Sequence, residues 1–275
     1  MNCAWNELLS VIPPRFRQQM DLLGKEDGLE LRLRLDRQPI LVRKKDSLRL
    51  SGNTTQNDLH YVVNMASKYS PWTAATIACG YVTAPGGHRI GLCGQALMKE
   101  GEMVGIQQLQ SLNIRIARDW EGISKSLSTE KGNMLILGRP GSGKTTLLRD
   151  LIRQLSYRET VCVVDERGEL FPPHFHRGDR MDVLIGCEKR KGIDCVLRTM
   201  SPDTIAIDEV TAQEDTQGFV QAAWCGVRLL ATCHAIDQRD LYKRKVYQPI
   251  IESNLFSTFV IMHEDKSFRL ERSDL

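Results

Sequence analysis

A phosphate-binding loop pattern is the clearest chemical signal in the sequence. Gly138 is followed by four residues and then by Gly-Lys-Thr, ending at Thr145. The apolar run 133–137 before it predicts a buried strand, and residues 146–155 after it have apolar side chains at helical spacing. A strand, a glycine-rich loop and a helix in this order surround a polyphosphate with backbone N–H groups. The residues that we predict to bind the nucleotide are Gly138, Arg139, Pro140, Gly141, Ser142, Gly143, Lys144, Thr145 and Thr146.

Two side chains of this loop have predicted roles of their own. Lys144 is expected to reach the β- and γ-phosphates, and the hydroxyl of Thr145 is expected to ligate Mg²⁺. The plainer interpretation is a glycine-rich turn that a Lys and a Thr follow by chance. The strand before the loop and the helix after it argue against that interpretation. The predicted ligands are therefore ATP and Mg²⁺.

An acidic pair ends a second predicted strand and supplies the other groups that an ATPase needs. Asp208 and Glu209 directly follow the strand residues 204–207. We expect Asp208 to hold the metal through its water shell and Glu209 to polarise the attacking water. In the sequence, a further strand at 160–165 comes between the phosphate loop and this pair, an order typical of P-loop ATPases with an additional catalytic glutamate. The alternative is a strand that ends in two solvated acids.

A third predicted strand, 227–234, ends in Thr-Cys-His, with His234 as its last residue. A hydroxyl and an imidazole at the carboxyl end of a parallel strand lie where ligands bind in such sheets. His234 is therefore a candidate sensor of the γ-phosphate. A single histidine at a strand end is often merely structural, and the sequence leaves both interpretations open.

The composition is that of an ordinary globular protein. The chain has 275 residues, of which 41% are apolar and 26% charged, and its net charge of +3 does not by itself favour nucleic acid or an anionic membrane. Its apolar runs are far shorter than the ~18 residues that span a bilayer, and its first residues do not resemble a signal peptide. Eight cysteines are scattered without a Cys-x-x-Cys pair, so we expect reduced thiols, no zinc and a cytosolic location.

The first part of the chain, 1–118, is predicted to be an α+β domain with an antiparallel sheet. Leucines at 29, 31, 33 and 35 alternate with charged residues, which is the pattern of a half-buried strand. Thr55 and Asp58 have capping-box spacing and open a helix. The other elements expected here are two short helices within 1–25, a helix at 71–79, and strands at 40–42, 81–84, 88–97, 103–106 and 111–117.

A polar stretch, 119–132, is the predicted linker to a second domain, 133–275. Strands and helices alternate after the phosphate loop, which predicts an α/β fold with a mostly parallel sheet. The elements expected near the end are helices at 238–246 and 249–254 and a hairpin of strands 258–263 and 267–270.

Several segments resemble the secretion ATPases of type II and type IV systems and the pilus motors. Residues 197–209 contain Arg-Thr-Met-Ser-Pro-Asp-Thr-Ile-Ala-Ile-Asp-Glu, similar to the Arg-x-x-Pro-Asp-x-Ile…Glu block of that family. Segments 222–227 and 231–235 are similar to its Ala…Gly-His segment and its His box, and 163–170 resembles its Asp box. The catalytic residues that this resemblance and the strand ends together predict are Glu209, Asp208, Glu166, Glu169 and His234.

The N-terminal domain of that family presents arginines towards the nucleotide. The matching segments here are Gly-His-Arg at 87–89 and Asn-Ile-Arg-Ile-Ala-Arg at 113–118. The resemblance therefore implies that Arg89, Arg115 or Arg118 neutralises charge on the γ-phosphate from across the domain gap or from a neighbouring subunit. The alternative for each is a solvated position on a sheet.

Within this superfamily the chain most closely resembles the stage III sporulation protein AA family of endospore-forming bacteria, over nearly its whole length. The segments that make the match close are 165–170, 87–91 and 113–118. The resemblance implies a RecA-like P-loop ATPase core with a smaller N-terminal α+β domain, and a homo-oligomeric ring, commonly a hexamer. It also implies a place on the cytosolic face of a membrane channel or secretion complex, in the mother cell at the channel to the forespore.

The chain departs from the secretion ATPases at two points. They have Gly before the catalytic Glu, where this chain has Asp208, which leaves open how Asp208 and Glu166 divide the work. The tetracysteine zinc insertion of some type II enzymes is absent from the sequence.

Two other functions fit parts of the sequence. A helicase or DNA translocase would follow phosphates with a basic cluster. That cluster consists of Arg32, Arg34, Arg37, Arg43, Lys44 and Lys45. It contains no aromatic residues for base stacking and is diluted by Glu30 and Asp36, so we do not expect nucleic acid to be a partner. A scaffold that binds ATP with little turnover is disfavoured by the intact acidic pair at 208–209.

Overall fold

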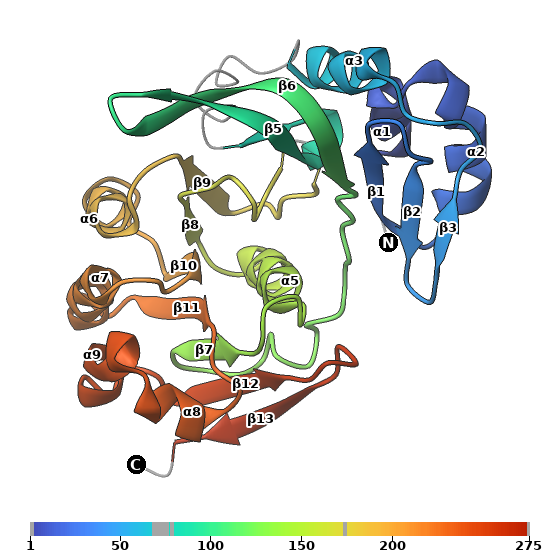
Figure 1. Ribbon diagram of the computed structural model, residues 1–275. Helices are drawn as coiled ribbons and strands as arrows, with labels where there is room; N and C mark the ends of the chain where they lie inside the picture. The colour runs from blue at the N-terminus through green and yellow to red at the C-terminus, as the bar shows by residue number, and fades with distance from the viewer. Residues whose placement is uncertain (1–2, 68–76, 78–79, 173–174, 274–275) are drawn as a thin grey trace. The chain divides into compact units, whose positions relative to one another are not determined.

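The computed structural model describes residues 3–67, 77, 80–172 and 175–273 (Figure 1). The chain divides into two compact units. Unit 1 contains Met1–Asp119 together with Phe175, and unit 2 contains Trp120–Pro172 and His176–Leu275.

Unit 1 is built on a six-stranded antiparallel sheet with the strand order β3-β2-β1-β6-β5-β4. Its strands are β1 (Gly28–Arg34), β2 (Ile40–Arg43), β3 (Ser47–Arg49), β4 (Tyr81–Thr83), β5 (Arg89–Lys99) and β6 (Glu102–Arg115). Its helices are α1 (Trp5–Val11), α2 (Pro14–Gly24), α3 (Gln56–Ser67) and the 3-10 turn η1 (Pro85–Gly87). The predicted helix at 71–79 lies, apart from Ile77, outside the described residues.

The alternating leucines place β1 in the sheet as predicted. Leu31 and Leu33 are fully buried in the core of unit 1, whereas Leu29 is 39% exposed. The pairing of β1 with β2 shifts register between Gly28 and Glu30, and this irregularity takes Leu29 out of the alternation. The capping prediction is also confirmed, because the carboxylate of Asp58 accepts hydrogen bonds from the backbone N–H and the hydroxyl of Thr55.

The two strands predicted at 103–106 and 111–117 are one strand, β6, so that part of the prediction was wrong. β6 remains paired with β5 along its whole length, with one register shift between Leu97 and Met98 and others on both sides of Gly94. Gln108 takes a φ of 47° inside this irregularity. The polar residues there suggest a turn in the sequence, but they form a bulge that keeps the strand continuous.

Unit 2 has a seven-stranded sheet with the order β13-β12-β7-β11-β10-β8-β9. Its strands are β7 (Met134–Leu137), β8 (Val161–Asp165), β9 (Met181–Ile185), β10 (Thr204–Glu209), β11 (Arg228–Cys233), β12 (Thr258–Met262) and β13 (Phe268–Arg272). All neighbours are parallel except β13, which runs antiparallel to β12. Its helices are α5 (Lys144–Ser156), α6 (Lys189–Thr199), α7 (Gln213–Trp224), α8 (Gln238–Lys243), η2 (Lys245–Tyr247) and α9 (Gln248–Glu252).

Helices cover both faces of this sheet, which confirms the predicted α/β class with a mostly parallel sheet. In Figure 1, α5 lies on one face, and α6, α7 and α9 lie on the other. The four buried residues of β7 alternate between the two cores that result, since Leu135 and Leu137 pack on one side and Met134 and Ile136 on the other. β9, α6 and α7 were not predicted from the sequence. In the helix α6, Gly192 allows a close approach, because a Cβ there would lie 2.4 Å from the side chain of Val164 in β8.

The strand order determines which loops meet. β11 lies between β7 and β10, and β8 lies beyond β10. Because these strands are parallel, the segments that follow their carboxyl ends share one edge of the sheet. The phosphate loop after β7, His234 after β11, and the acidic pair at the end of β10 are therefore neighbours.

The stretch before β7 is bound to unit 2. The buried carboxylate of Asp150 in α5 accepts hydrogen bonds from the backbone N–H of Gly122 and from both the N–H and the hydroxyl of Ser124. Arg153 completes this buried cluster, with its Nη1 3.1 Å from Asp150. The division of the chain into 1–118, 119–132 and 133–275 remains a proposal, and these bonds favour assigning the linker stretch to the second domain.

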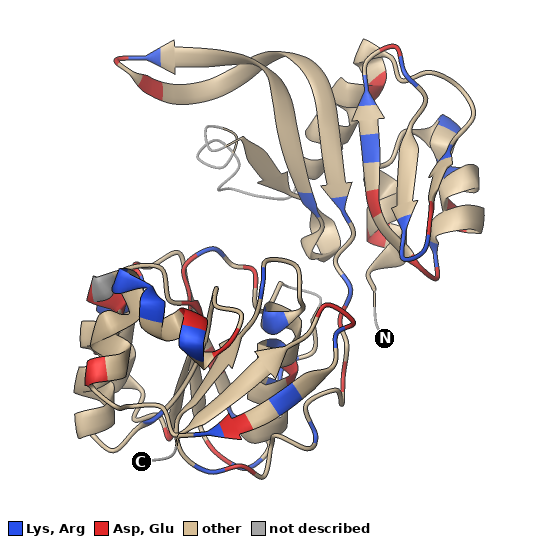
Figure 2. Ribbon diagram, turned by 60° about the horizontal axis from the view of Figure 1, so that its bottom comes forward, with Lys and Arg blue, Asp and Glu red and all other residues tan. Residues whose placement is uncertain are grey.

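Charged residues of both signs are distributed over both units (Figure 2). Among the described residues, no helix combines the length and the apolar character needed to cross a membrane.

Candidate active site

The phosphate loop leaves β7 and enters α5 through two glycines in the left-handed region. Gly141 has a φ of 75° and Gly143 a φ of 100°, conformations that favour glycine. A Cβ placed on Gly141 would have no neighbour within 4 Å, so the loop is open at this position. Thr146 lies in the first turn of α5, behind Lys144 and Thr145. The loop therefore has the open, glycine-lined form that a phosphate group requires.

Gly138 and Ser142 give the loop two further features. Gly138 allows close packing, because a Cβ there would lie 2.5 Å from Oγ of Ser142 and 2.9 Å from Cβ of Met262. The hydroxyl of Ser142 is buried and has no hydrogen-bond partner among the described residues. An unpartnered buried hydroxyl in a nucleotide-binding loop is available to a bound ligand.

Lys144 is buried at the start of α5, and its ammonium group faces the loop. Nζ donates hydrogen bonds to the carbonyls of Gly138 and Arg139, at 2.9 and 3.1 Å, and it lies 2.9 Å from Nδ1 of His234. Burial lowers the pKa of Lys144, and the nearby charge of Glu209 opposes this shift. The lysine is thus held at the mouth of the loop by groups that a phosphate can replace.

Thr145 and Asp208 are in direct contact. The Thr145 hydroxyl donates a 2.9 Å hydrogen bond to Oδ1 of Asp208 at the end of β10. Burial raises the pKa of Asp208, the bond from Thr145 opposes this shift, and the charges of Asp165 and Glu209 add to it. A hydroxyl and a carboxylate in contact at the start of α5 are the donor set that holds Mg²⁺ in P-loop ATPases, so the residues present fit this metal.

His234 joins the loop lysine to the second acid. Its Nε2 lies 2.9 Å from Oε1 of Glu209, and its Nδ1 accepts a hydrogen bond from Lys144. An ammonium group can only donate, so Nδ1 must accept and Nε2 carries the proton that binds Glu209. The backbone N–H of His234 donates to the hydroxyl of Tyr247, which holds the residue in place. Burial raises the pKa of Tyr247 to about 12, so this hydroxyl stays neutral.

Asp165, the last residue of β8, holds the loop that follows this strand. Its carboxylate accepts hydrogen bonds from the backbone N–H groups of Glu169 and Leu170, at 3.0 and 2.8 Å. Burial raises the pKa of Asp165, and the backbone bonds, first that of Leu170, oppose the shift. Arg149 of α5 donates to the carbonyls of the same two residues, so the loop is bound from both sides.

The structure brings Glu166 to the acidic pair. Glu166, Asp208 and Glu209 line one small hollow, whereas Glu169 is not among its lining residues. The carboxylate of Glu166 is 2.8 Å from Nζ of Lys189, a lysine of α6 that also lies 3.7 Å from Asp215.

Sequence reasoning missed Lys189 and Asp215. Lys189 lies in a charged segment, 188–191, where nothing marks it as buried. Asp215 follows the common pattern of an acid in the first turn of a helix, and it accepts hydrogen bonds from the backbone N–H groups of Thr211 and Ala212. That pattern alone does not indicate that the acid faces a lysine from another helix.

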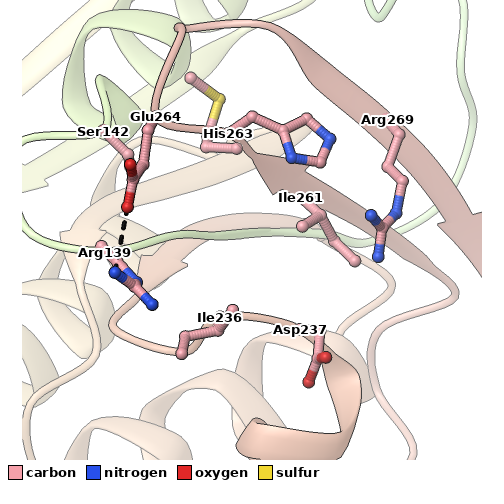
Figure 3. A pocket seen from close by; sticks show the side chains of 9 residues that line it. Arg139, Ser142, Ile236, Asp237, Ile261, His263, Glu264 and Arg269 are labelled. Atoms are coloured by element: carbon pink, nitrogen blue, oxygen red, sulfur yellow. Dashed lines mark hydrogen bonds and ion pairs between the residues drawn. The ribbon is translucent and has the colours of Figure 1, made fainter.

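A second hollow, of about 240 Å³, lies beside the phosphate loop (Figure 3). Its lining combines residues of the loop, of the segment after β11 and of the β12–β13 hairpin, namely Arg139, Ser142, Ile236, Asp237, Ile261, Met262, His263, Glu264 and Arg269. In Figure 3 the side chains of Arg139 and Glu264 point towards each other across one end of the hollow, with Nη1 3.0 Å from Oε1. Sequence reasoning assigned no role to this hairpin.

The three candidate arginines of unit 1 differ in their surroundings. Arg89 and Arg115 are opposite each other on β5 and β6, and the guanidinium of Arg89 lies 4.0 Å from the ring centre of Tyr81. Arg115 is 65% exposed, with Glu30 3.7 Å away. Arg118 is buried and donates to backbone carbonyls, including that of Gly28 at 3.0 Å. These contacts favour a structural role for Arg118 and leave Arg89 and Arg115 as the better candidates to reach a nucleotide.

His88, between Gly87 and Arg89, has a structural role. It is fully buried, and its Nδ1 accepts a hydrogen bond from the backbone N–H of Ala117 at 3.0 Å. Its Nε2 lies 3.0 Å from the carbonyl of Ala4, so the ring connects the start of the chain to the end of β6. The Gly-His-Arg segment therefore contains one core histidine and one half-buried arginine.

Comparison with known proteins gives a family and a fold. The family described as sporulation stage III, protein AA, matches residues 6–270. Stage III sporulation protein AA of Bacillus subtilis (strain 168) is 33% identical over 95% of this chain and 92% of its own length. The type IV pilus assembly ATPase TfpB of Acinetobacter baylyi is 26% identical over 51% of this chain and 22% of its own.

Two solved structures share the fold at low sequence identity. The Legionella pneumophila ATPase DotB is 15% identical, with a TM-score of 0.63 over 95% of this chain and 80% of its own. The pilus retraction motor PilT, solved with bound ADP, is 16% identical, with a TM-score of 0.62. The match covers 92% of this chain and 79% of the PilT chain. These two likenesses confirm the predicted fold class, a RecA-like core with a smaller N-terminal domain.

Proposed function

The chain belongs to the sporulation stage III, protein AA family, and from this premise we propose that it is an ATP-hydrolysing motor that energises a membrane channel or secretion complex during endospore formation. The observation that carries the proposal is the 2.9 Å hydrogen bond between Thr145 and Asp208. It brings the hydroxyl of the phosphate loop to the acid of a separate strand, as Mg²⁺-dependent hydrolysis of ATP requires.

We propose the following roles for the residues of unit 2. Thr145 and Asp208 hold Mg²⁺, which neutralises charge on the β- and γ-phosphates when it is bound. Lys144 binds the β- and γ-phosphates from the mouth of the loop. Glu209 orients and polarises the attacking water, and His234 fixes the direction of the Glu209 carboxylate through its Nε2–H.

Glu166 has a secondary place in this proposal. Its bond to Lys189 compensates its charge, and Lys189 is itself bound to the hydroxyl of Thr211. Glu209, by contrast, is joined through His234 to Lys144 of the phosphate loop. We therefore assign the activation of water to Glu209, and to Glu166 a role in the surroundings of the metal. For Glu169 we propose no direct contact with the nucleotide.

We further propose that the protein works as a ring of identical subunits, with six as the expected number, at the cytosolic face of a membrane complex. Arg89 and Arg115 are the groups that we expect to complete the site, from the N-terminal part of the same or a neighbouring subunit. A relative named as a type IV pilus assembly ATPase and the solved structure of a pilus retraction motor with the same fold support a motor of this kind.

A nucleic-acid motor has less support. Within the basic cluster, Arg32 is bound to Glu30 at 2.7 Å and Arg43 is bound to Asp46 at 2.6 Å. Figure 2 shows residues of both signs along the ribbon. A polyanion would have to compete with these internal partners.

The test combines nucleotide binding, turnover and size. Wild-type protein should bind a fluorescent ATP analogue and release phosphate only with Mg²⁺ present, and it should form larger assemblies when ATP is added. Lys144→Ala should remove binding, because it deletes the cation that binds the β- and γ-phosphates. Normal ATP binding by this variant would reject the site. A strictly monomeric protein with full turnover would reject the ring.

A further inference from the structure

The turn between β12 and β13 lies against the phosphate loop. Glu264 forms its ion pair with Arg139, and Nζ of Lys266 donates a hydrogen bond to the carbonyl of Gly141. Met262, just before the turn, is 3.5 Å from the position of a Cβ on Gly143. A segment more than a hundred residues away in the sequence thus contacts the loop at several points.

Hydrogen bonds inside the turn hold it in one conformation. The backbone N–H of His263 donates to the carbonyl of Ser267 at 2.9 Å, and that of Lys266 donates to the carbonyl of His263 at 3.2 Å. Asp265 accepts from both the N–H and the hydroxyl of Ser267. Lys266 itself has a φ of 71°, which residues other than glycine rarely adopt. These bonds fix the backbone from which the Lys266 side chain extends towards the loop.

The charge of Lys266 has no carboxylate partner in the described part of the chain. Its neighbour Asp265 is bound to Ser267, and Glu264 is bound to Arg139. The stem of Lys266 runs beside Gly143, where a Cβ would lie 3.6 Å from its Cδ. The ammonium group is thus bonded to the carbonyl of Gly141, and its stem lies beside Gly143, in the part of a phosphate loop that surrounds the α- and β-phosphates.

We propose that Lys266 is a second phosphate-binding lysine, which contacts the α- and β-phosphates of a bound nucleoside di- or triphosphate while Lys144 contacts the β- and γ-phosphates. An ammonium group has three donors, and the Gly141 carbonyl uses one, so two remain for phosphate oxygens. This inference rests on the proposed function, because it requires that the loop binds a nucleotide.

The position of the contact predicts its kinetic consequence. The α- and β-phosphates are present in both ATP and ADP, and neither is transferred. Lys266 should therefore strengthen the binding of both nucleotides equally and leave the chemical step unchanged. KM for ATP should depend on Lys266, and kcat at saturating ATP should not.

The experiment measures the affinity of the full chain for fluorescent ADP and ATP analogues by titration. Lys266→Ala should weaken both by about tenfold, the size expected for a charge-assisted contact that is partly exposed. The substitution keeps a Cβ at the left-handed position, so it removes the ammonium without changing backbone strain. Lys266→Arg should bind both nucleotides with an affinity within about threefold of the wild type. Thermal melting checks that each variant is folded.

Two further variants separate phosphate binding from attachment of the turn. Glu264→Gln removes the ion pair between the turn and Arg139 of the loop, and it should change ADP affinity by less than about twofold. Lys131→Ala removes an exposed lysine at the opposite end of β7 and should have no effect. Normal ADP binding by Lys266→Ala, or an equal loss in Glu264→Gln, would overturn the inference. The proposed function would survive either result as long as Lys144→Ala abolishes binding, and would fail if it does not.

Discussion

Lys144 and Glu209 are joined through one imidazole ring. Nδ1 of His234 lies 2.9 Å from Nζ of Lys144, and its Nε2 lies 2.9 Å from Oε1 of Glu209. The lysine belongs to the phosphate loop and the glutamate to the end of β10, with β11 and His234 between them. A change at the lysine when a phosphate binds or leaves can therefore reach the proposed base through a single residue.

Replacing Glu209 with Gln should lower turnover at least about 10²-fold, because the amide cannot accept a proton from the attacking water. ATP affinity should stay near that of the wild type, since the phosphate loop is unchanged. Phosphate release and titration with a fluorescent analogue measure the two effects. Glu214→Gln, an exposed acid on α7, is the control and should hydrolyse ATP normally. Unchanged turnover in Glu209→Gln would reject Glu209 as the base.

Replacing His234 with Ala should lower kcat by roughly 10–100-fold, because Glu209 loses the donor that orients it. The Kd for ATP should change less than kcat, since the loop itself is intact. His176→Ala, which removes a half-exposed histidine of the same unit, should leave both constants unchanged. If kcat is normal in His234→Ala, the residue is a structural strand-end histidine.

Asp208→Asn should raise the free energy of unfolding of the protein and weaken its binding of Mg²⁺. Burial raises the pKa of Asp208 in the folded protein, so ionised Asp208 destabilises the fold near neutral pH. The folded state binds the proton of Asp208 more tightly than the unfolded state does. The destabilisation is therefore complete above the pKa of the folded state, and it is lost as the pH falls through that pKa towards the pKa of the unfolded state. We expect a gain of roughly 0.5–2 kcal/mol at pH 7 that shrinks on acidification.

Denaturant unfolding of wild type and Asp208→Asn at a series of pH values measures this gain. A difference that stays constant from neutral to acidic pH would show that burial of the charge is not its cause. Asp208→Asn should also require more Mg²⁺ for half-maximal turnover, because a neutral amide is a weaker ligand than a carboxylate.

Lys189→Met should destabilise unit 2 by about 2–4 kcal/mol, because it leaves the buried carboxylate of Asp215 without its cation. The melting temperature and the denaturation midpoint measure the loss. Lys191→Met removes an exposed lysine of the same helix, which pairs with Glu188 at the surface, and it should have no measurable effect. Equal stability of the two variants would contradict a buried role for Lys189.

The sequence by itself determined the local chemistry of this protein. The phosphate loop depends on glycines at fixed positions between a strand and a helix, and consecutive residues specify such a turn. The alternating leucines of β1 and the capping pair Thr55 and Asp58 are local in the same way, and the structure contains both. The family resemblance, which rests on motifs of consecutive residues, added the acids after β8 and the expected partners.

Only the tertiary structure decided which of these motifs act together. The order β7-β11-β10-β8 places His234 between the loop and the acidic pair, and strand order depends on crossovers that no short segment encodes. The same holds for the ion pair of Glu166 with Lys189 and for the bond from Lys266 to Gly141, in which residues far apart in the chain meet. The burial of Arg118 and His88 could likewise not be predicted from the sequence. A charged or polar side chain is buried only where backbone groups from distant parts of the chain form hydrogen bonds with it.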